Sequence, residues 1–243
     1  MEESIKETRT GGEERNAVSV EEEDGGAGSP VAGRRMLAAW EIASVVSSFL
    51  IAEWMIVPFA ENNKLLQAIP IGLALLLMLL SHRERGETAR EIGWRFDNFG
   101  AAARLLALPM LAGALVIVGA GLYMRSLRLE REQFWQWALW LPLWGLMQQY
   151  VLQGFINRRA ELLCGRNTRS LLLVALVFAL LHLPNPWLSV ATFIGGFIWA
   201  AVYQRAPNLP ALALSHGLMS LLLASSLPPA MLNSLRVGFK YFG

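Results

Sequence analysis

Carboxamide side chains recur at regular spacing in one apolar part of the chain, residues 134–155 and the residues just after it. Gln148 and Gln149 are adjacent, and Gln149, Gln153 and Asn157 are each four residues apart. Residues four apart in an α-helix share one face, so these three amides are predicted to form a polar stripe. A carboxamide donates and accepts hydrogen bonds but has no useful basicity. The stripe is therefore suited to binding or orienting a group, and not to removing a proton from it.

Two histidines occur in further apolar segments. His182 ends the segment 170–183, and His216 lies in the segment 210–227, with Ser220 four residues later on the same helical face. Imidazole transfers protons near neutral pH and can polarise a carbonyl group. Taken singly, such residues also act as hydrogen-bonding contacts between membrane helices, worth about 0.6–2 kcal/mol each. Because amides and histidines occur in three successive segments, we predict that they converge on one buried polar centre.

The elements that must position these residues are membrane-spanning helices. The 243 residues are 54% hydrophobic and 16% charged, whereas soluble domains carry about 25% charged residues, and the mean hydropathy is +0.40. These values exclude a soluble single domain and a disordered chain. About 20 apolar residues cross a bilayer, and candidate spans lie at 36–59, 65–80, 100–123, 134–155, 170–183, 188–204 and 210–227. The predicted fold is all-α: a polytopic membrane helical bundle with about seven transmembrane helices.

Charge divides the chain into two parts. Residues 1–35 carry nine acidic and five basic residues and are predicted to form a disordered cytoplasmic tail, with a multi-pass membrane domain at 36–243. With seven spans and an internal N-terminus, the inner flanks hold eleven Lys and Arg residues and the outer segments six, which favours that orientation. The expected location is a bacterial inner or plasma membrane. Basic residues stand singly between apolar segments, so the expected partner is the lipid bilayer and not nucleic acid.

Cysteine and tryptophan usage adds two expectations. Cys164 is the only cysteine, which excludes a disulfide framework and a cysteine-based zinc cluster. Trp40, Trp135, Trp137 and Trp187 lie near span ends and are interpreted as anchors at the membrane interface.

In order and spacing, the polar residues resemble the three motifs of the CPBP intramembrane proteases, which include the type II CAAX prenyl endopeptidases and bacteriocin-processing proteins. The family motifs are Glu-Glu-x-x-x-Arg, Phe-x-x-x-His, and His-x-x-x-Asn or Asp. The corresponding stretches here are Gln148-Gln149-Tyr-Val-Leu-Gln153, Phe178-Ala-Leu-Leu-His182 and His216-Gly-Leu-Met-Ser220. The stretches Glu91-Ile-Gly93-Trp94 and Asn208-Leu-Pro also look like family segments, and the family-like core covers about residues 90–225.

The resemblance implies an intramembrane endopeptidase that acts on membrane-embedded or membrane-proximal peptides or proteins. The residues at the family's catalytic positions are Gln148, Gln149, His182 and His216, and those at supporting positions are Gln153, Phe178 and Ser220. A divalent metal such as zinc is the cofactor that the resemblance allows, with His182 and His216 as its ligands.

The glutamines at the family's carboxylate positions leave more than one function open. General-base catalysis contributes about 10²–10⁴ in rate, and Gln148 and Gln149 cannot supply it. Gln153 replaces the arginine that the missing carboxylates would have left unpaired, so the three changes form a consistent neutral array. One alternative is a protease with another base, for which Glu53 is the only carboxylate expected at membrane depth, although a structural role for Glu53 is also open. The other is a catalytically inactive pseudoprotease that binds or scaffolds a membrane partner, and a small transporter or channel is a third.

Overall fold

The computed structural model describes residues 30–60, 63–128 and 134–243. Within these ranges every regular element is a helix and no strand occurs, which confirms the all-α fold. In chain order the elements are α1 (Pro30–Ile51), the π-helix η1 (Ala52–Ile56), α2 (Val57–Phe59), α3 (Lys64–Glu84), α4 (Ala89–Ile92), α5 (Phe99–Tyr123), α6 (Phe134–Gln149), the π-helix η2 (Tyr150–Asn157), α7 (Arg158–Cys164), α8 (Thr168–Leu180), α9 (Pro186–Arg205), α10 (Leu209–Ser226), α11 (Pro229–Leu232) and the 3-10 helices η3 (Asn233–Leu235) and η4 (Gly238–Phe242).

Each of the seven apolar segments is found as a helix, but they do not all meet the requirements for a membrane span. Within the described residues, five stretches are long and apolar enough to cross a membrane, namely Pro30–Phe59, Lys64–Glu84, Phe99–Tyr123, Pro186–Arg205 and Leu209–Ser226. The helix α8 has only 13 residues, and the 16-residue α6 contains tryptophans and glutamines and continues into η2. Length and composition thus show five of the predicted spans among the described residues, and the other two, α6 with η2 and α8, fall below this criterion and stay predictions. The chain is an integral membrane protein.

The boundary of the N-terminal tail differs from the prediction. The helix α1 already begins at Pro30, so residues 30–35 are helical and continuous with the first candidate span. The remainder of the predicted disordered tail, residues 1–29, lies outside the described residues.

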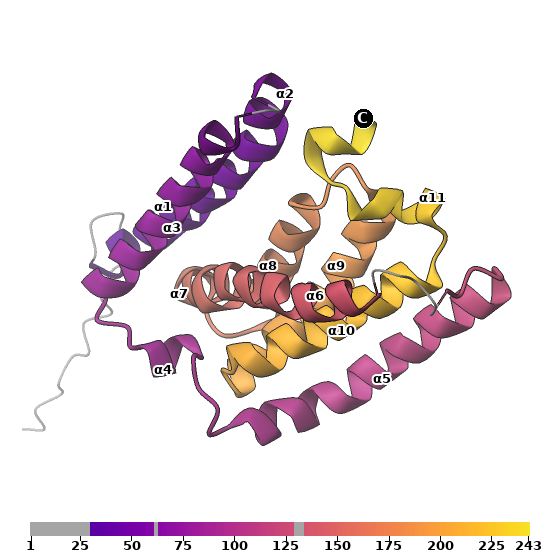
Figure 1. The fold of residues 1–243 in the computed structure, drawn as a ribbon. Helices are drawn as coiled ribbons and strands as arrows, with labels where there is room; N and C mark the ends of the chain where they lie inside the picture. Colours follow the sequence, from indigo (N-terminus) through magenta and orange to yellow (C-terminus); the bar gives the residue numbers. More distant parts are fainter. Residues whose placement is uncertain (1–29, 61–62, 129–133) are drawn as a thin grey trace, which may run out of the picture.

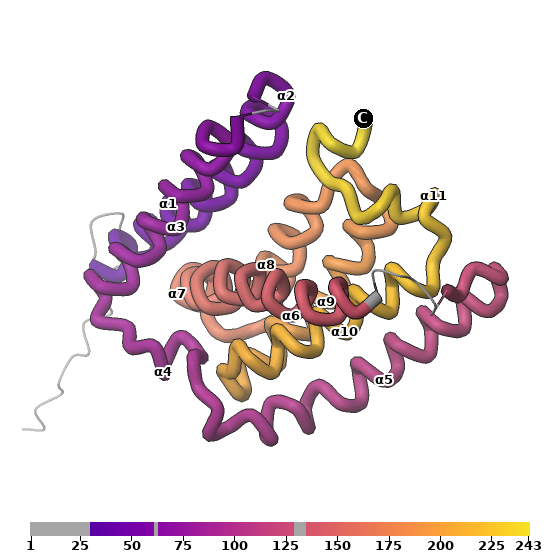
Figure 2. The backbone as a smooth tube through the Cα atoms, in the orientation of Figure 1, coloured from indigo at the N-terminus to yellow at the C-terminus, as the bar shows by residue number. Residues whose placement is uncertain are grey.

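The helices form a hairpin and a core (Figures 1 and 2). The hairpin consists of α1 and α3 and contacts the core through α7. In the core, α6 and α5 both pack along α10, and α8 packs along α9. The approach of α6 to α10 is close because Gly217 has no side chain: a Cβ there would lie 2.7 Å from the backbone nitrogen of Pro142. Small residues permit such close packing of membrane helices.

The short helix α4 is fastened to the turn between α9 and α10. It begins with a capping box, in which the Thr88 hydroxyl accepts from the Glu91 backbone N–H and the Glu91 carboxylate accepts from that of Thr88. It ends at Gly93, whose φ of +99° few other residues adopt without strain. The Gly93 carbonyl accepts from the Leu209 N–H at 2.8 Å, and the Tyr203 hydroxyl donates to the carbonyl of the residue before Gly93. These two hydrogen bonds attach the end of α4 to the core, although most of the residues 88–98 are exposed.

A buried ionic cluster joins the hairpin to the core. The Arg159 side chain on α7 is fully buried, and its Nη1 and Nη2 donate to the two carboxylate oxygens of Glu87 at 2.9 Å each. Its Nη2 also donates to the Ser81 hydroxyl at 2.9 Å, and its Nε lies 3.0 Å from a carboxylate oxygen of Glu41. Ser81 in turn donates to Glu41. Glu53 is therefore not the only carboxylate in the first candidate span, because Glu41 on α1 is also there, buried and paired with arginines.

The pKa of Glu87 reflects its partners in this cluster. Burial alone raises the pKa of a carboxyl group. Hydrogen bonds from His82, Arg159 and Arg158 outweigh the effect of burial and hold the Glu87 pKa well below its ordinary value of 4.5. Glu87 therefore remains a carboxylate throughout the physiological pH range.

Candidate functional site

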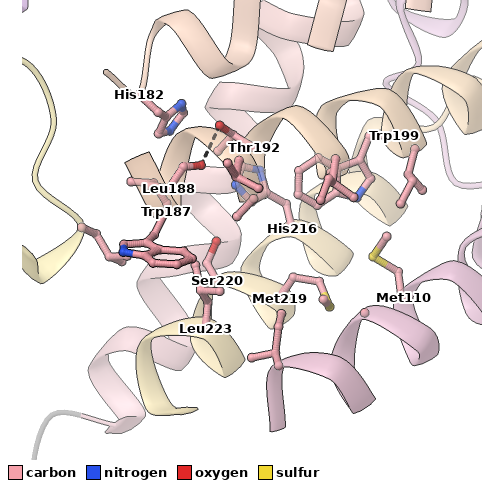
Figure 3. Close-up of a pocket in the computed structure, with 18 of the residues that line it drawn as sticks. Met110, His182, Trp187, Leu188, Thr192, Trp199, His216, Met219, Ser220 and Leu223 are labelled. Atoms are coloured by element: carbon pink, nitrogen blue, oxygen red, sulfur yellow. Dashed lines mark hydrogen bonds between the residues drawn. The ribbon is translucent and has the colours of Figure 1, made fainter. Parts of the chain in front are cut away.

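A cavity of about 920 Å³ lies between α5, α6, α9 and α10. His182 and His216 both line it, as do Gln148 and Ser220, so four of the predicted site residues lie at one cavity. Figure 3 shows the two imidazoles and Ser220 among the apolar side chains of this cavity. The segment after α10 also contributes lining residues, which brings the chain's C-terminal part over the same space.

His216 on α10 is oriented by Gln149, the last residue of α6. The carboxamide Nε2 of Gln149 lies 3.2 Å from Nδ1 of His216, and both side chains are buried. In the amide orientation of the structure, Nε2 donates and Nδ1 accepts, so the neutral ring carries its proton on Nε2. In this orientation Oε1 of Gln149 is buried without a hydrogen-bond partner, and the Nε2–H is the donor that the His216 ring keeps.

His182 is oriented in the opposite sense by its own helix. Its Nδ1 lies 2.7 Å from the backbone carbonyl oxygen of Phe178, one turn earlier on α8. A carbonyl oxygen only accepts, so Nδ1 carries the proton and Nε2 keeps its lone pair. The Phe178 ring packs edge-on against both imidazoles, with ring centroids 4.7 Å from His182 and 5.8 Å from His216. The Phe-x-x-x-His motif thus fixes both the tautomer and the position of this ring.

Trp199 on α9 completes the wall behind His216. Its indole ring lies against the imidazole with centroids 4.5 Å apart, and its Nε1 donates to the Ser215 hydroxyl at 2.9 Å. Gly195 makes room for the indole, because a Cβ at that position would lie 2.8 Å from the Trp199 ring. Trp199 was not among the predicted site residues, although a glycine one turn before a tryptophan in an apolar helix indicates close packing around the indole. Trp187, which was interpreted as an interfacial anchor, also lines the cavity.

Gln153 lies away from the histidines, in a second buried polar chain. Asn157 donates to the Gln153 carbonyl oxygen at 2.8 Å, and Gln204 donates to Asn157 at 2.9 Å and to Ser170 at 3.1 Å. The predicted stripe is therefore divided: Gln149 reaches His216, whereas Gln153 and Asn157 tie η2 to α8 and α9. The physical reason is the π-helix after Gln149, whose i→i+5 hydrogen bonds change the angle between successive side chains.

Glu53 and Ser220 complete the set of predicted candidates. Glu53 does not line the cavity but packs against Gly238, where a Cβ would lie 2.7 Å from the Glu53 Cβ. Ser220 lies one turn beyond His216 and faces the cavity. Among the described residues, Ser220 is thus at the position that could contact a bound ligand, and Glu53 is not.

The donor set at the cavity does not fit a zinc site. Catalytic zinc takes three protein ligands, and no group of three His, Cys, Asp or Glu side chains that could hold a metal ion occurs in the described part of the chain. His182 has the arrangement of a metal ligand, with Nδ1 bonded to a carbonyl. His216 has the reverse arrangement, because Gln149 occupies its Nδ1 lone pair and leaves a proton on Nε2. The described residues at the cavity therefore do not form a zinc site.

Comparison with known protein families gives one match. Residues 106–222 match the family described as type II CAAX prenyl endopeptidase Rce1-like. This stretch contains α6, α8, α9 and most of α10, and hence every residue of the cavity's polar centre. No curated protein and no solved structure matches the chain.

Proposed function

Because residues 106–222 match the type II CAAX prenyl endopeptidase Rce1-like family, we propose that the protein is an intramembrane peptidase whose water-activating base is His182. The observation that carries this proposal is the opposite hydrogen-bonding state of the two imidazoles at one cavity. His182 offers the lone pair of Nε2, and His216 offers the proton on Nε2.

The two rings divide the work of hydrolysis. The lone pair of His182 accepts a proton from water as the water oxygen attacks the peptide carbonyl carbon, and the His216 N–H donates to the carbonyl oxygen as negative charge develops on it. The C–N bond then breaks, and His182 returns the proton to the leaving amine. His182 thus removes the proton from water, which a glutamine amide cannot do. Gln149 keeps His216 in the tautomer that donates from Nε2.

The alternative proposal is a pseudoprotease that binds a membrane peptide without cleaving it. The specific observation in its favour is that Gln148 and Gln149 occupy both carboxylate positions of the family motif. In this case the His216 N–H and the His182 Nε2 lone pair bind a peptide group. The protein then presents the bound peptide to a partner protein.

Cleavage and binding by purified protein distinguish the two functions. The protein is incubated in bicelles with a panel of apolar membrane peptides, and products are identified by mass spectrometry. We expect cleavage by the wild type, loss of at least about 100-fold in rate for His182→Ala, and a rate within about threefold of wild type for Thr192→Val. Thr192 lines the same cavity but uses its hydroxyl to donate to the Leu188 carbonyl at 2.8 Å, so it is a matched control.

Two results would change the assignment. Binding of a peptide by the wild type with no product at any time would favour the pseudoprotease. Loss of cleavage on chelation of divalent metals would overturn the role of His182 as a metal-independent base.

We also propose that the N-terminus lies in the cytoplasm, in a bacterial plasma membrane, as the distribution of arginines favours. The single cysteine provides the test. Cys164 ends α7 and is partly exposed, and it lies on the cytoplasmic side when α6 with η2 and α8 cross the membrane as predicted, in addition to the five long apolar helices. A membrane-impermeant maleimide should label Cys164 only after cells are opened, and labelling of intact cells would reverse the orientation.

A further inference from the structure

The segment that follows α10, residues 227–243, covers one end of the cavity. Figure 1 shows it running from the end of α10 to the turn between α8 and α9. Its residues Leu227, Leu235 and Val237 line the cavity and pack with Leu188 and Leu223. These two leucines lie in the first turn of α9 and the last turn of α10, and both helices are long enough to cross a membrane. Such helices meet water at their ends, so the segment lies between the cavity and water.

A buried amide side chain next to His182 holds this C-terminal segment in place. Asn185 is fully buried, and its Nδ2 donates to the Leu232 carbonyl at 2.7 Å and to the Arg236 carbonyl at 3.3 Å. The backbone N–H of Asn185 donates to the His182 carbonyl at 3.1 Å. The C-terminal segment is therefore attached to the turn that carries His182.

Between the two carbonyls that Asn185 holds, the backbone passes through three residues with positive φ. The φ angles of Asn233, Ser234 and Leu235 are +43°, +55° and +61°. Asparagine tolerates this left-handed region, but in other L-residues it brings the Cβ close to the following carbonyl oxygen. Residues in such a conformation persist only where the surrounding structure holds them there. The hydrogen bonds of Asn185 and the apolar packing of Leu235 thus hold the turn in a strained conformation.

We propose that the C-terminal segment is a gate that opens when residues 233–235 leave the left-handed turn, and that the open gate admits water to the cavity. Opening gives up the apolar packing of Leu235 but releases the backbone strain, so the closed and open states lie close in free energy. The inference rests on the proposed function, because hydrolysis consumes a water molecule that must reach His182.

The reactivity of a cysteine inside the cavity measures the gate. Ser220 faces the cavity, so Ser220→Cys places a thiol there, and Cys164→Ser removes the native cysteine. This parent protein in bicelles is treated with a thiosulfonate reagent that carries a permanent positive charge, because a charged reagent travels through water and not through lipid. The rate of modification is followed by mass spectrometry in the absence of any peptide, so the measurement does not depend on cleavage.

Two substitutions in the segment should change this rate in opposite directions. The Ser234 side chain is exposed, and Ser234→Gly removes the strain of its positive φ, so the closed gate is favoured and the rate should fall by at least about threefold. Leu235→Ala removes apolar contacts that hold the gate closed, so the rate should rise by at least about tenfold.

Matched controls come from the same segment. Ala230 and Phe239 are exposed and do not line the cavity, and neither has a positive φ. Ala230→Gly and Phe239→Ala should therefore leave the rate within about threefold of the parent protein, and Ala230→Gly should not lower it.

The outcomes separate the gate from the proposed function. A rate for Ser234→Gly that equals or exceeds that of the parent protein, or an unchanged rate for Leu235→Ala, would overturn the gate even if the wild type cleaves peptides. The two expected shifts, together with no cleavage of any peptide by the wild type, would support the gate and overturn the proposed hydrolysis.

Discussion

Removing the buried guanidinium of Arg159 should separate the α1–α3 hairpin from the core. Arg159→Met keeps much of the side-chain volume but removes the donors to Glu87 and Ser81 and the positive charge beside Glu41. Loss of one partner of a buried ion pair costs about 3–5 kcal/mol, because it leaves buried charge uncompensated. Here Glu41 keeps Arg85 at 2.8 Å, and Glu87 keeps a second arginine, so we expect the lower end, about 3 kcal/mol.

A second Arg–Glu pair in the same part of the chain provides a matched control. Arg166 lies 3.9 Å from Glu161, and its side chain is 60% exposed, whereas that of Arg159 is 0% exposed. Exposed pairs contribute about 0–1 kcal/mol, so Arg166→Met should change stability by no more than that.

Equilibrium unfolding of the purified protein in micelles, with denaturant titration followed by tryptophan fluorescence, measures both changes. Arg159→Lys tests the geometry, because an ammonium cannot bridge two carboxylates in the same fork; its loss should fall between those of Arg159→Met and wild type. If Arg159→Met loses no more free energy of unfolding than Arg166→Met, the cluster does not hold the hairpin to the core.

Three further predictions concern pH, close packing and the C-terminal segment. Glu87 has a folded-state pKa below 4.5, so its carboxylate stabilises the fold above pH 4.5, and this contribution is lost as the pH falls below that value. In unfolding titrations, the difference in unfolding free energy between wild type and Glu87→Gln should therefore be constant near pH 7 and shrink below pH 4.5. Gly217→Ala pushes a methyl group against the Pro142 backbone and should cost about 1–3 kcal/mol in the same assay, whereas Gly119→Ala, with open space around it, should cost nothing. Asn185 is fully buried, caps α9 and donates to a carbonyl of the C-terminal segment at 2.7 Å, so Asn185→Ala should cost about 2–3 kcal/mol and expose that segment to limited proteolysis.

Hydropathy predicted the helical segments well but not the contacts between them. The apolar segments of the sequence all occur as helices, because length and composition alone determine which stretches prefer lipid. The pairing of Glu41 with Arg159 could not be predicted in the same way, since the two lie far apart in the sequence. A glutamate within an apolar helix gives no indication of which arginine compensates it.

The candidate site was predicted in part. The spacing of the polar residues indicated that His182, His216 and the adjacent glutamines meet, and the structure brings them to one cavity and its wall. The π-helix that diverts Gln153 toward α8 could not be predicted, because it follows from packing and not from local residue preference. The tautomers also depend on partners in other helices or on local backbone geometry, which spacing does not reveal.

The state of the two imidazoles is the central claim, and it can be measured directly. The chain has only three histidines, so ¹⁵N-histidine labelling gives at most three sets of ring signals, which His82→Gln, His182→Gln and His216→Gln variants assign. At pH 7.5 we predict neutral His182 with its proton on Nδ1 and neutral His216 with its proton on Nε2. The same tautomer in both rings, or a positive charge on either, would contradict the account.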